Sequence, residues 1–106
     1  MGTFRLTAKA KTDLKLIAAY TQRKWGKAQR HLYIKQLDDV FHLLADNPGT
    51  GSKCDYIKQG YQKHSSGSHI IFYRQIDESL IEIVRILHKR MDAFAHLKDS
   101  GVPHEK

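Results

Sequence analysis

Two neighbouring segments near the C-terminal end are apolar on both of their faces, and this feature limits the possible fold most. Residues 69–75 read HIIFYRQ and residues 80–87 read LIEIVRIL, both dense in β-branched and aromatic residues. A turn at residues 77–79 (Asp-Glu-Ser) separates them, which predicts an antiparallel pair of strands. Antiparallel sheets that are wet on one side alternate apolar with polar residues, and these strands do not. Both faces of the predicted sheet therefore need a cover.

Strict alternation along each strand assigns its apolar side chains to the two faces. Within the later strand, one face is predicted to carry Ile81, Ile83 and Leu87, and the other Leu80, Val84 and Ile86. Within the earlier strand, Ile70 and Phe72 are opposed to Ile71 and Tyr73.

A pair of helices that precedes the strands can cover one face. Apolar residues recur at helical spacing up to Trp25, which we expect to lie in the core, and basic residues fill the opposite side. Thr7 is placed to cap this helix and Gly26 to end it. A second apolar stripe begins near Lys27 and stops at Asn47, because a residue before proline disfavours the helical conformation. Helices joined by so short a turn form an antiparallel hairpin. The predicted core residues are Leu14, Ile17, Leu37, Phe41, Leu44 and Phe72.

The order of the elements predicts an α+β domain. A first strand at residues 3–6 precedes the helical hairpin, residues 49–60 read as a loop, and a strand at 61–64 follows. With a turn at residues 65–68, this strand and the two apolar ones form an antiparallel meander on which the hairpin packs. A short C-terminal helix or tail ends the chain.

The length of 106 residues corresponds to one domain. We expect this domain at residues 1–97 and a flexible polar tail at residues 98–106. The hairpin covers only one face of the sheet, so the other must be covered by the segment after residue 87, by another chain, or by both. Exposed apolar surface of that extent marks an interaction site, and we therefore expect a partner chain.

The net charge of the chain favours an anionic partner. The chain has 18 Lys and Arg against 11 Asp and Glu, a formal charge of +7. Nucleic acid, an acidic protein and an acidic peptide would all satisfy this surplus. The lysines of the first helix follow its outer, solvated face, so we do not expect direct nucleic-acid binding.

No cofactor or metal is expected. Cys54 is the only cysteine, and the seven histidines are scattered without a His-x-x-x-His pair. No apolar run approaches the roughly 18 residues of a membrane helix, and the N-terminus lacks the apolar core of a signal peptide. We expect a cytoplasmic protein with no membrane partner.

Five segments, in order, resemble the ParE toxins of the ParE/RelE toxin–antitoxin superfamily. The resemblance covers about residues 3 to 92. Its most specific part is formed by the last two segments together, the second of which contains the pattern Arg-Ile-Leu-His-x-x-Met-Asp. The segments are AKTDLKLI (10–17), Trp25-Gly26, LADNP (44–48), GSHIIFY (67–73) and VRILHKRMD (84–92).

The resemblance implies the toxin of a type II toxin–antitoxin system, of the kind that serves plasmid maintenance in bacteria. Such a toxin inhibits DNA gyrase, through the A subunit, and thereby replication. It is encoded beside an acidic, partly disordered antitoxin of the ParD kind, which wraps it and folds on binding. The RelE branch shares the fold but cleaves messenger RNA on the ribosome, which leaves a ribonuclease as the alternative.

A ribonuclease needs a general base, a general acid and cations around the scissile phosphate. The candidate residues are Lys63, His64, His69, Arg74, Arg85, His88, Lys89 and Arg90. RelE-type enzymes often carry a tyrosine or histidine near the C-terminus, and the tail from His88 onward has no tyrosine. His69 stands about where RelE-like sequences carry an arginine. We therefore expect an inhibitor without catalytic residues.

The resemblance directs attention to the end of the final strand as the surface that binds gyrase. The residues concerned are Arg85, His88, Lys89, Arg90 and Met91. We expect Lys89 and Arg90 to face solvent, because a basic cluster beside an exposed methionine combines charge steering with adaptable apolar contact. The alternative is that these residues only cap the sheet and bind the antitoxin.

Overall fold

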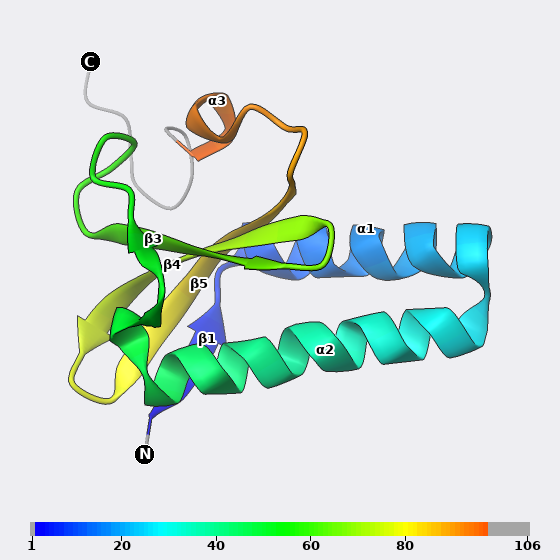
Figure 1. Ribbon diagram of the computed structural model, residues 1–106, viewed down its shortest axis with the longest axis horizontal. Helices are drawn as coiled ribbons and strands as arrows, with labels where there is room; N and C mark the ends of the chain where they lie inside the picture. The colour runs from blue at the N-terminus through cyan, green and yellow to red at the C-terminus, as the bar shows by residue number, and fades with distance from the viewer. Residues whose placement is uncertain (1, 98–106) are drawn as a thin grey trace.

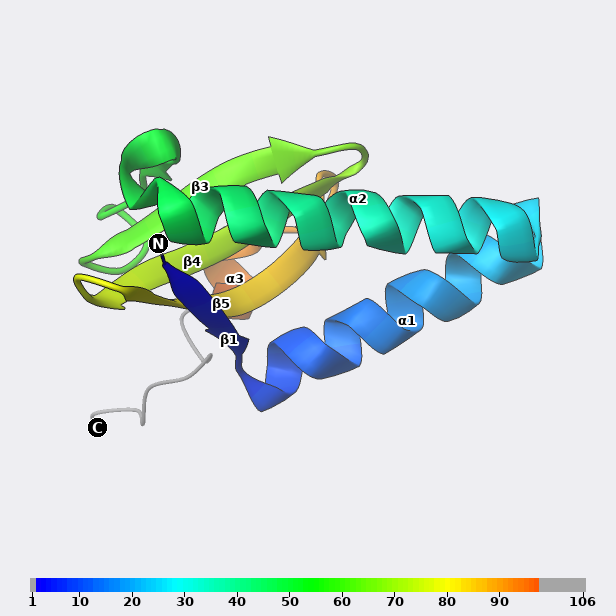
Figure 2. The same cartoon turned by 90° about the horizontal axis from the view of Figure 1, so that it is seen from below.

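The computed structural model describes residues 2–97, and its helices pack on a five-stranded sheet (Figures 1 and 2). The tail expected at residues 98–106 lies outside this range. The elements in chain order are β1 (Thr3–Leu6), α1 (Ala8–Trp25), α2 (Lys27–Asp46), the 3-10 turn η1 (Pro48–Thr50), β2 (Ser52–Lys53), β3 (Tyr61–Ser66), β4 (His69–Asp77), β5 (Leu80–His88) and α3 (Ala93–Leu97). The α+β prediction is confirmed. No helix among the described residues is both long enough and apolar enough to cross a bilayer.

The helical hairpin begins and turns where the sequence predicts. The Thr7 hydroxyl accepts a hydrogen bond from the Ala10 backbone N–H at 3.0 Å, which satisfies a free donor of the first turn of α1. Gly26 alone joins the helices and has φ of +96°, a backbone conformation that residues with a Cβ rarely adopt. The second helix ends at Asp46, before the Asn47-Pro48 pair.

The sheet has the order β1-β5-β4-β3-β2. Strands β3, β4 and β5 form the predicted antiparallel meander, and β1 pairs parallel to β5. The turn between β3 and β4 is shorter than predicted, because pairing continues to Ser66 and His69 and leaves only Gly67 and Ser68. Gly67 has φ of +58°, and a Cβ there would meet the Tyr33 ring at 2.7 Å.

The segment expected as a loop at residues 49–60 contains the two-residue strand β2, which pairs with β3. So short a strand has no alternation that a sequence could display. Tyr73 holds the segment in place, since its hydroxyl accepts from the Gly51 N–H at 2.8 Å and donates to the Pro48 carbonyl at 2.7 Å.

A β-bulge changes which side chains of β5 point to each face of the sheet. Phe72 is paired with Arg85 but Tyr73 with Ile83, so Val84 has no partner opposite. Beyond this extra residue the alternation reverses, and Ile86 joins the helix-side core while Leu87 joins the outer one. The predicted placement of Ile86 and Leu87 is therefore wrong.

The helix-side core lies between the hairpin and the sheet. It contains Ile17, Leu37, Phe41 and Leu44, with Leu14 packed against it, as predicted. The Phe41 side chain is 2% exposed and its ring centroid lies 5.3 Å from that of Phe4.

Trp25 was expected in this core but is 65% exposed. The hairpin projects past the sheet, so its last turns have no strand beneath them (Figures 1 and 2). Helical spacing places Trp25 on the correct side of α1 but says nothing of where the sheet stops.

The outer face of the sheet carries a second core. Phe72, Val84 and Leu87 pack there with Tyr61, Cys54 and Leu97. The C-terminal segment thus supplies part of the cover, as one of the alternatives predicted. The loop after β2 supplies another part through Cys54, a contribution that the sequence did not indicate.

Candidate functional site

The backbone after β5 forms a turn that presents three consecutive side chains to solvent. Lys89 N–H donates to the Ser68 carbonyl at 3.0 Å, and Met91 N–H to the His88 carbonyl at 2.9 Å. The Arg90 N–H donates to Nδ1 of His88 at 3.1 Å. Lys89 and Arg90 are exposed, as expected, and the Met91 side chain is 49% exposed. The local hydrogen bonds therefore fix the turn without occupying its charged or apolar ends.

Arg85 does not join this group. Its guanidinium donates to both carboxylate oxygens of Asp13 in α1, at 2.7 and 2.9 Å. Asp13 Oδ2 also accepts from the Ile86 N–H at 3.0 Å. The two side chains are only 14% and 10% exposed, so Arg85 is a link between α1 and β5.

Sequence reasoning missed Asp13, although a signal was available. It is the only carboxylate among the first 37 residues, and its position lies between Ala10 and Ile17 on the apolar side of the helix. A carboxylate at such a position needs a buried cation, and β5 offers Arg85.

Two histidines and a tyrosine meet beside the turn. His69 and His88 are cross-strand partners whose ring centroids lie 5.4 Å apart, nearly perpendicular. Nδ1 of His69 lies 2.7 Å from the Tyr33 hydroxyl of α2, which also accepts from the Ser68 N–H at 3.0 Å. Burial lowers the pKa of His69, and the neighbouring His88 lowers this pKa further. Tyr33 thus anchors α2 to the end of the sheet.

A groove of about 560 Å³ lies between α1 and this end of the sheet, and Tyr33 of α2 also lines it. We call it the hairpin–sheet groove. Its α1 wall includes Leu16, Tyr20, Lys24 and Trp25, and its opposite wall includes Tyr33, His69, His88 and Met91.

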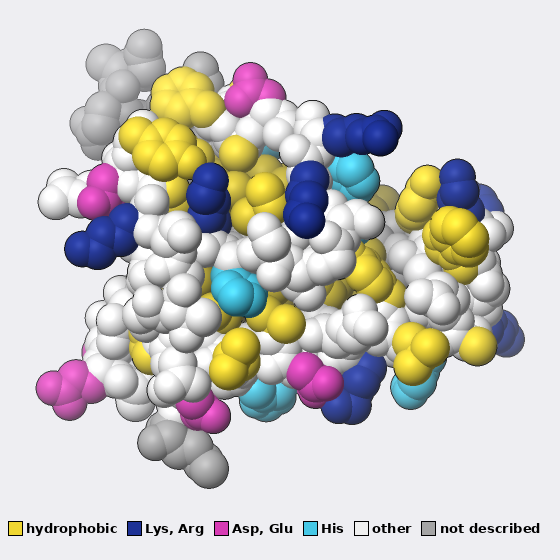
Figure 3. Space-filling model, viewed as in Figure 1, with side chains coloured by type: hydrophobic (Ala, Val, Ile, Leu, Met, Phe, Trp, Pro, Cys, Tyr) yellow, Lys and Arg dark blue, Asp and Glu magenta, His cyan; other side chains and the backbone are white. Residues whose placement is uncertain are grey.

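The exposed Trp25 lines this groove. Trp25, Tyr20 and Leu16 are all large hydrophobic side chains left exposed along this wall. Hydrophobic side chains are also visible on the projecting end of the hairpin in Figure 3. The charged end of Lys24 lies 6.0 Å from the centre of the Tyr20 ring. The site thus combines apolar surface with cations, the composition of a protein-binding surface.

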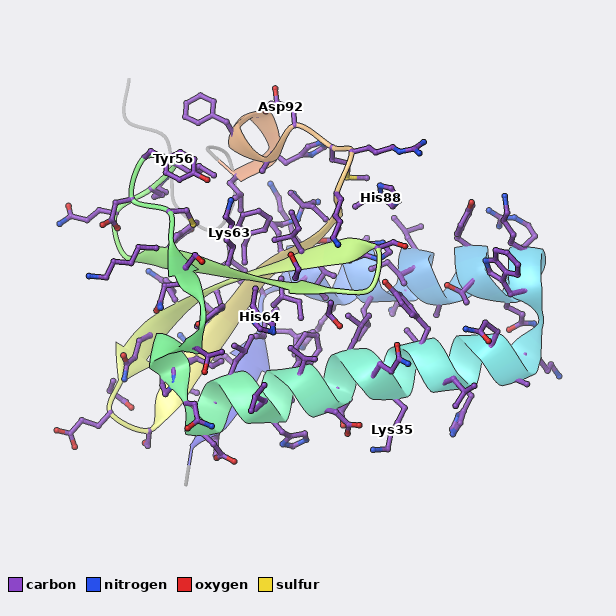
Figure 4. All side chains as sticks on the ribbon, in the orientation of Figure 1. Lys35, Tyr56, Lys63, His64, His88 and Asp92 are labelled. Atoms are coloured by element: carbon purple, nitrogen blue, oxygen red, sulfur yellow. The ribbon has the colours of Figure 1, made fainter. Side chains whose placement is uncertain are left out.

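The other basic residues of the sheet do not converge on one point. Lys63 lies on the α3 side, where its ammonium donates to the Tyr56 hydroxyl at 3.1 Å, whereas His64 lies toward α2 (Figure 4). Arg74 is paired with Glu82 at 2.9 Å. Within residues 2–97, no group of three or more His, Cys, Asp or Glu side chains is arranged to hold a metal ion.

Comparison with known proteins gives a family for this chain. A family model described as the ParE toxin of the type II toxin–antitoxin system parDE matches residues 4–93. Toxin ParE1 of Caulobacter vibrioides is 38% identical over 97 residues, which cover 92% of this chain and 99% of that protein. Toxin ParE1 of Mycobacterium tuberculosis is 39% identical over 94 residues, covering 89% and 96% respectively.

A solved structure supports the fold independently. A chain from the chromosomal ParDE toxin–antitoxin system of P. aeruginosa has a TM-score of 0.68 at 18% sequence identity. The match covers 83% of this chain and 96% of that one.

Proposed function

The chain belongs to the ParE toxin family of type II toxin–antitoxin systems, and from this premise we propose that it inhibits DNA gyrase, and thereby replication. The observation that carries the proposal is the solvent-facing turn Lys89-Arg90-Met91 beside an apolar groove. We propose that this turn contacts the A subunit of gyrase and that a cognate antitoxin prevents the contact.

The chemistry of the turn suits a protein target. Lys89 and Arg90 form no ion pair with a carboxylate of residues 2–97, and two such cations would speed association with an acidic surface, or with a protein that holds DNA. The thioether of Met91 adapts to irregular apolar surfaces. His88 supports the turn through its bond from the Arg90 N–H. We leave Arg85 out of the contact, because Asp13 holds its guanidinium.

The arrangement of the arginines favours inhibition over ribonuclease activity. A ribonuclease would need cationic groups free to stabilise a phosphate in the transition state. Two arginines of the sheet, Arg85 and Arg74, are already paired with Asp13 and Glu82. Lys63 and His64 lie toward opposite faces of the sheet, so these two do not converge on a phosphate.

An antitoxin partner follows from the family. We propose a small ParD-like protein with an acidic, partly disordered C-terminal half. The +7 charge of the toxin and the exposed apolar wall of the hairpin–sheet groove both favour a partner of this composition. The region beside this gene should encode it.

Charge reversal tests the gyrase contact. We expect Lys89→Glu with Arg90→Glu to weaken inhibition of supercoiling by purified gyrase at least about tenfold, because like charges oppose docking. Lys53→Glu with Lys58→Glu makes the same change in charge near the far edge of the sheet and should inhibit like wild type. Circular dichroism establishes that each variant is folded.

A folded Lys89→Glu/Arg90→Glu variant that inhibits as strongly as wild type would refute this placement. Deleting all residues after Leu87 would be a poorer test of the same contact. Such a deletion removes Leu97, which is fully buried in the outer core, so loss of activity would follow from loss of structure.

A further inference from the structure

The turn that we propose as the gyrase contact lies just beyond the end of the sheet. The last cross-strand pair of β4 and β5 is His69 with His88, and Lys89, Arg90 and Met91 follow it. Backbone past the end of a strand pair opens readily, so its side chains keep one direction only where further bonds hold it. Two connections reach this backbone from the neighbouring elements, one at Lys89 and one at Arg90.

The first connection runs through Ser68, in the turn between β3 and β4. Its carbonyl accepts a hydrogen bond from the Lys89 N–H at 3.0 Å, and its own N–H donates to the Tyr33 hydroxyl of α2 at 3.0 Å. The Tyr33 ring lies directly against the same turn, since a Cβ at Gly67 would meet it at 2.7 Å. Tyr33 therefore holds the residue to which Lys89 is bonded.

The second connection runs through two imidazole rings. Nδ1 of His69 lies 2.7 Å from the Tyr33 hydroxyl, and the His69 ring stands nearly perpendicular to the His88 ring, with 5.4 Å between the centroids. Nδ1 of His88 in turn accepts from the Arg90 N–H at 3.1 Å. Both connections thus begin at one atom, the hydroxyl oxygen of Tyr33.

The protonation states of the two side chains allow both bonds at once. Burial raises the pKa of Tyr33 above its ordinary value, so the hydroxyl keeps its proton at neutral pH. Burial lowers the pKa of His69, which leaves the ring neutral and Nδ1 free to accept. The hydroxyl can then accept from the Ser68 N–H while it donates to His69. The Ser66 carbonyl, at 3.3 Å, is the more distant acceptor.

We propose that Tyr33 is a positioning residue for the gyrase contact, whose hydroxyl holds the Lys89-Arg90-Met91 turn in the conformation that docks. This inference rests on the proposed gyrase contact and adds to it a residue of α2 that acts through the turn. A loop already held in its bound conformation loses less freedom on association, which strengthens binding without any new contact. The competing explanation is that Tyr33, which lines the hairpin–sheet groove, touches gyrase directly.

Amide hydrogen exchange of the free toxin, followed by NMR at neutral pH, measures the hold on the turn. Tyr33→Phe removes only the hydroxyl, and we expect the N–H groups of Ser68 and Lys89 to exchange at least about tenfold faster. Tyr20→Phe, on the α1 wall of the same groove, is the matched control and should exchange like wild type. The Thr7 N–H, bonded to the Ile83 carbonyl, should be unchanged in both variants and shows that the fold is intact.

Inhibition of supercoiling by purified gyrase measures the consequence for function. We expect half-inhibition by Tyr33→Phe to need about fivefold more toxin than wild type, because the turn must be ordered on docking. Tyr20→Phe should inhibit like wild type. In a Lys89→Ala/Arg90→Ala background, Tyr33→Phe should change inhibition by less than about twofold, since the side chains that it holds are absent.

Four outcomes would overturn the inference. Wild-type exchange of the Ser68 and Lys89 N–H groups in folded Tyr33→Phe would show that the hydroxyl does not hold the turn. Faster exchange with undiminished inhibition would show that the hold has no role in docking. A full fivefold loss in the alanine background would make Tyr33 a direct contact, and the proposed function would stand in all three cases. Failure of wild-type toxin to inhibit supercoiling would overturn the proposed function and the role of Tyr33 together.

Discussion

The Asp13–Arg85 pair provides a sharp test of how the hairpin is held to the sheet. Asp13→Ala removes two charge-assisted hydrogen bonds and the acceptor for the Ile86 N–H. What remains is a guanidinium on β5 whose side chain is 14% exposed in the native fold. Breaking such a pair by removing one partner costs about 3–5 kcal/mol, most of it from the charge left without a counter-ion.

The remaining exposure of Arg85 places the expected loss at the lower end of that range. Water can reach the guanidinium once the Asp13 carboxylate is absent, which recovers part of its solvation. We therefore expect Asp13→Ala to lower the free energy of unfolding by about 3 kcal/mol. For a domain of this size that corresponds to a fall in Tm of about 10–20 °C.

Urea unfolding of the free toxin, followed by circular dichroism, measures the change. Arg5→Ala is the control, because it breaks an ion pair with Glu82 in which the arginine side chain is 55% exposed. Such pairs contribute about 0–1 kcal/mol. The double variant Asp13→Leu/Arg85→Met should recover most of the loss, since no charge stays buried. A loss below about 1 kcal/mol for Asp13→Ala would refute the structural role assigned to this pair.

Two further perturbations test the core and the histidine pair. Phe41→Ala should lower the free energy of unfolding by about 3–5 kcal/mol. The measurement is made on the free toxin, because a bound antitoxin would mask the loss. A change under about 1 kcal/mol would mean that Phe41 is not central to the helix-side core. Burial lowers the pKa of His69 below 6.5, so the unfolded chain binds more protons than the folded one when the pH falls through 6.5. The contribution of neutral His69 to stability is therefore present above pH 6.5 and is lost on acidification. The fall in unfolding free energy between pH 7.5 and pH 5.5 should therefore be smaller in His69→Gln than in wild type, with the exposed His31→Gln as control, and equal falls in all three proteins would contradict the burial argument.

The elements of the fold could be predicted because each has a local signal. The hairpin shows helical periodicity with Gly26 and Pro48 at its ends, and the meander shows apolar strands separated by short turns. The strand β2 gives no such signal, since it has only two residues and is held beside β3 in part by Tyr73, which lies far away in the sequence.

The features of the fold that the sequence did not predict depend on contacts between distant parts of the chain. The bulge at Val84 reverses the faces of Ile86 and Leu87, and nothing in the local pattern marks it. The exposure of Trp25 depends on how far the hairpin projects past the sheet. The hairpin–sheet groove likewise depends on the relation between separate elements, so residue spacing alone does not reveal it.

The candidate site was predicted in part. His88, Lys89, Arg90 and Met91 lie together at the end of β5, as their proximity in sequence requires. Arg85 is separated from them because its guanidinium is bound by the Asp13 carboxylate of α1. The contribution of Leu16, Tyr20 and Trp25 to the neighbouring groove could not be foreseen without the packing of α1.

Supercoiling by purified DNA gyrase, measured with the wild-type toxin, tests the proposed function most directly. We predict that the toxin inhibits supercoiling in proportion to its concentration, and that the adjacent gene product restores activity when added in equal amount. The same toxin should leave messenger RNA intact on translating ribosomes. Unaffected supercoiling, together with cleavage of translated messenger RNA, would contradict gyrase inhibition and identify a ribonuclease instead.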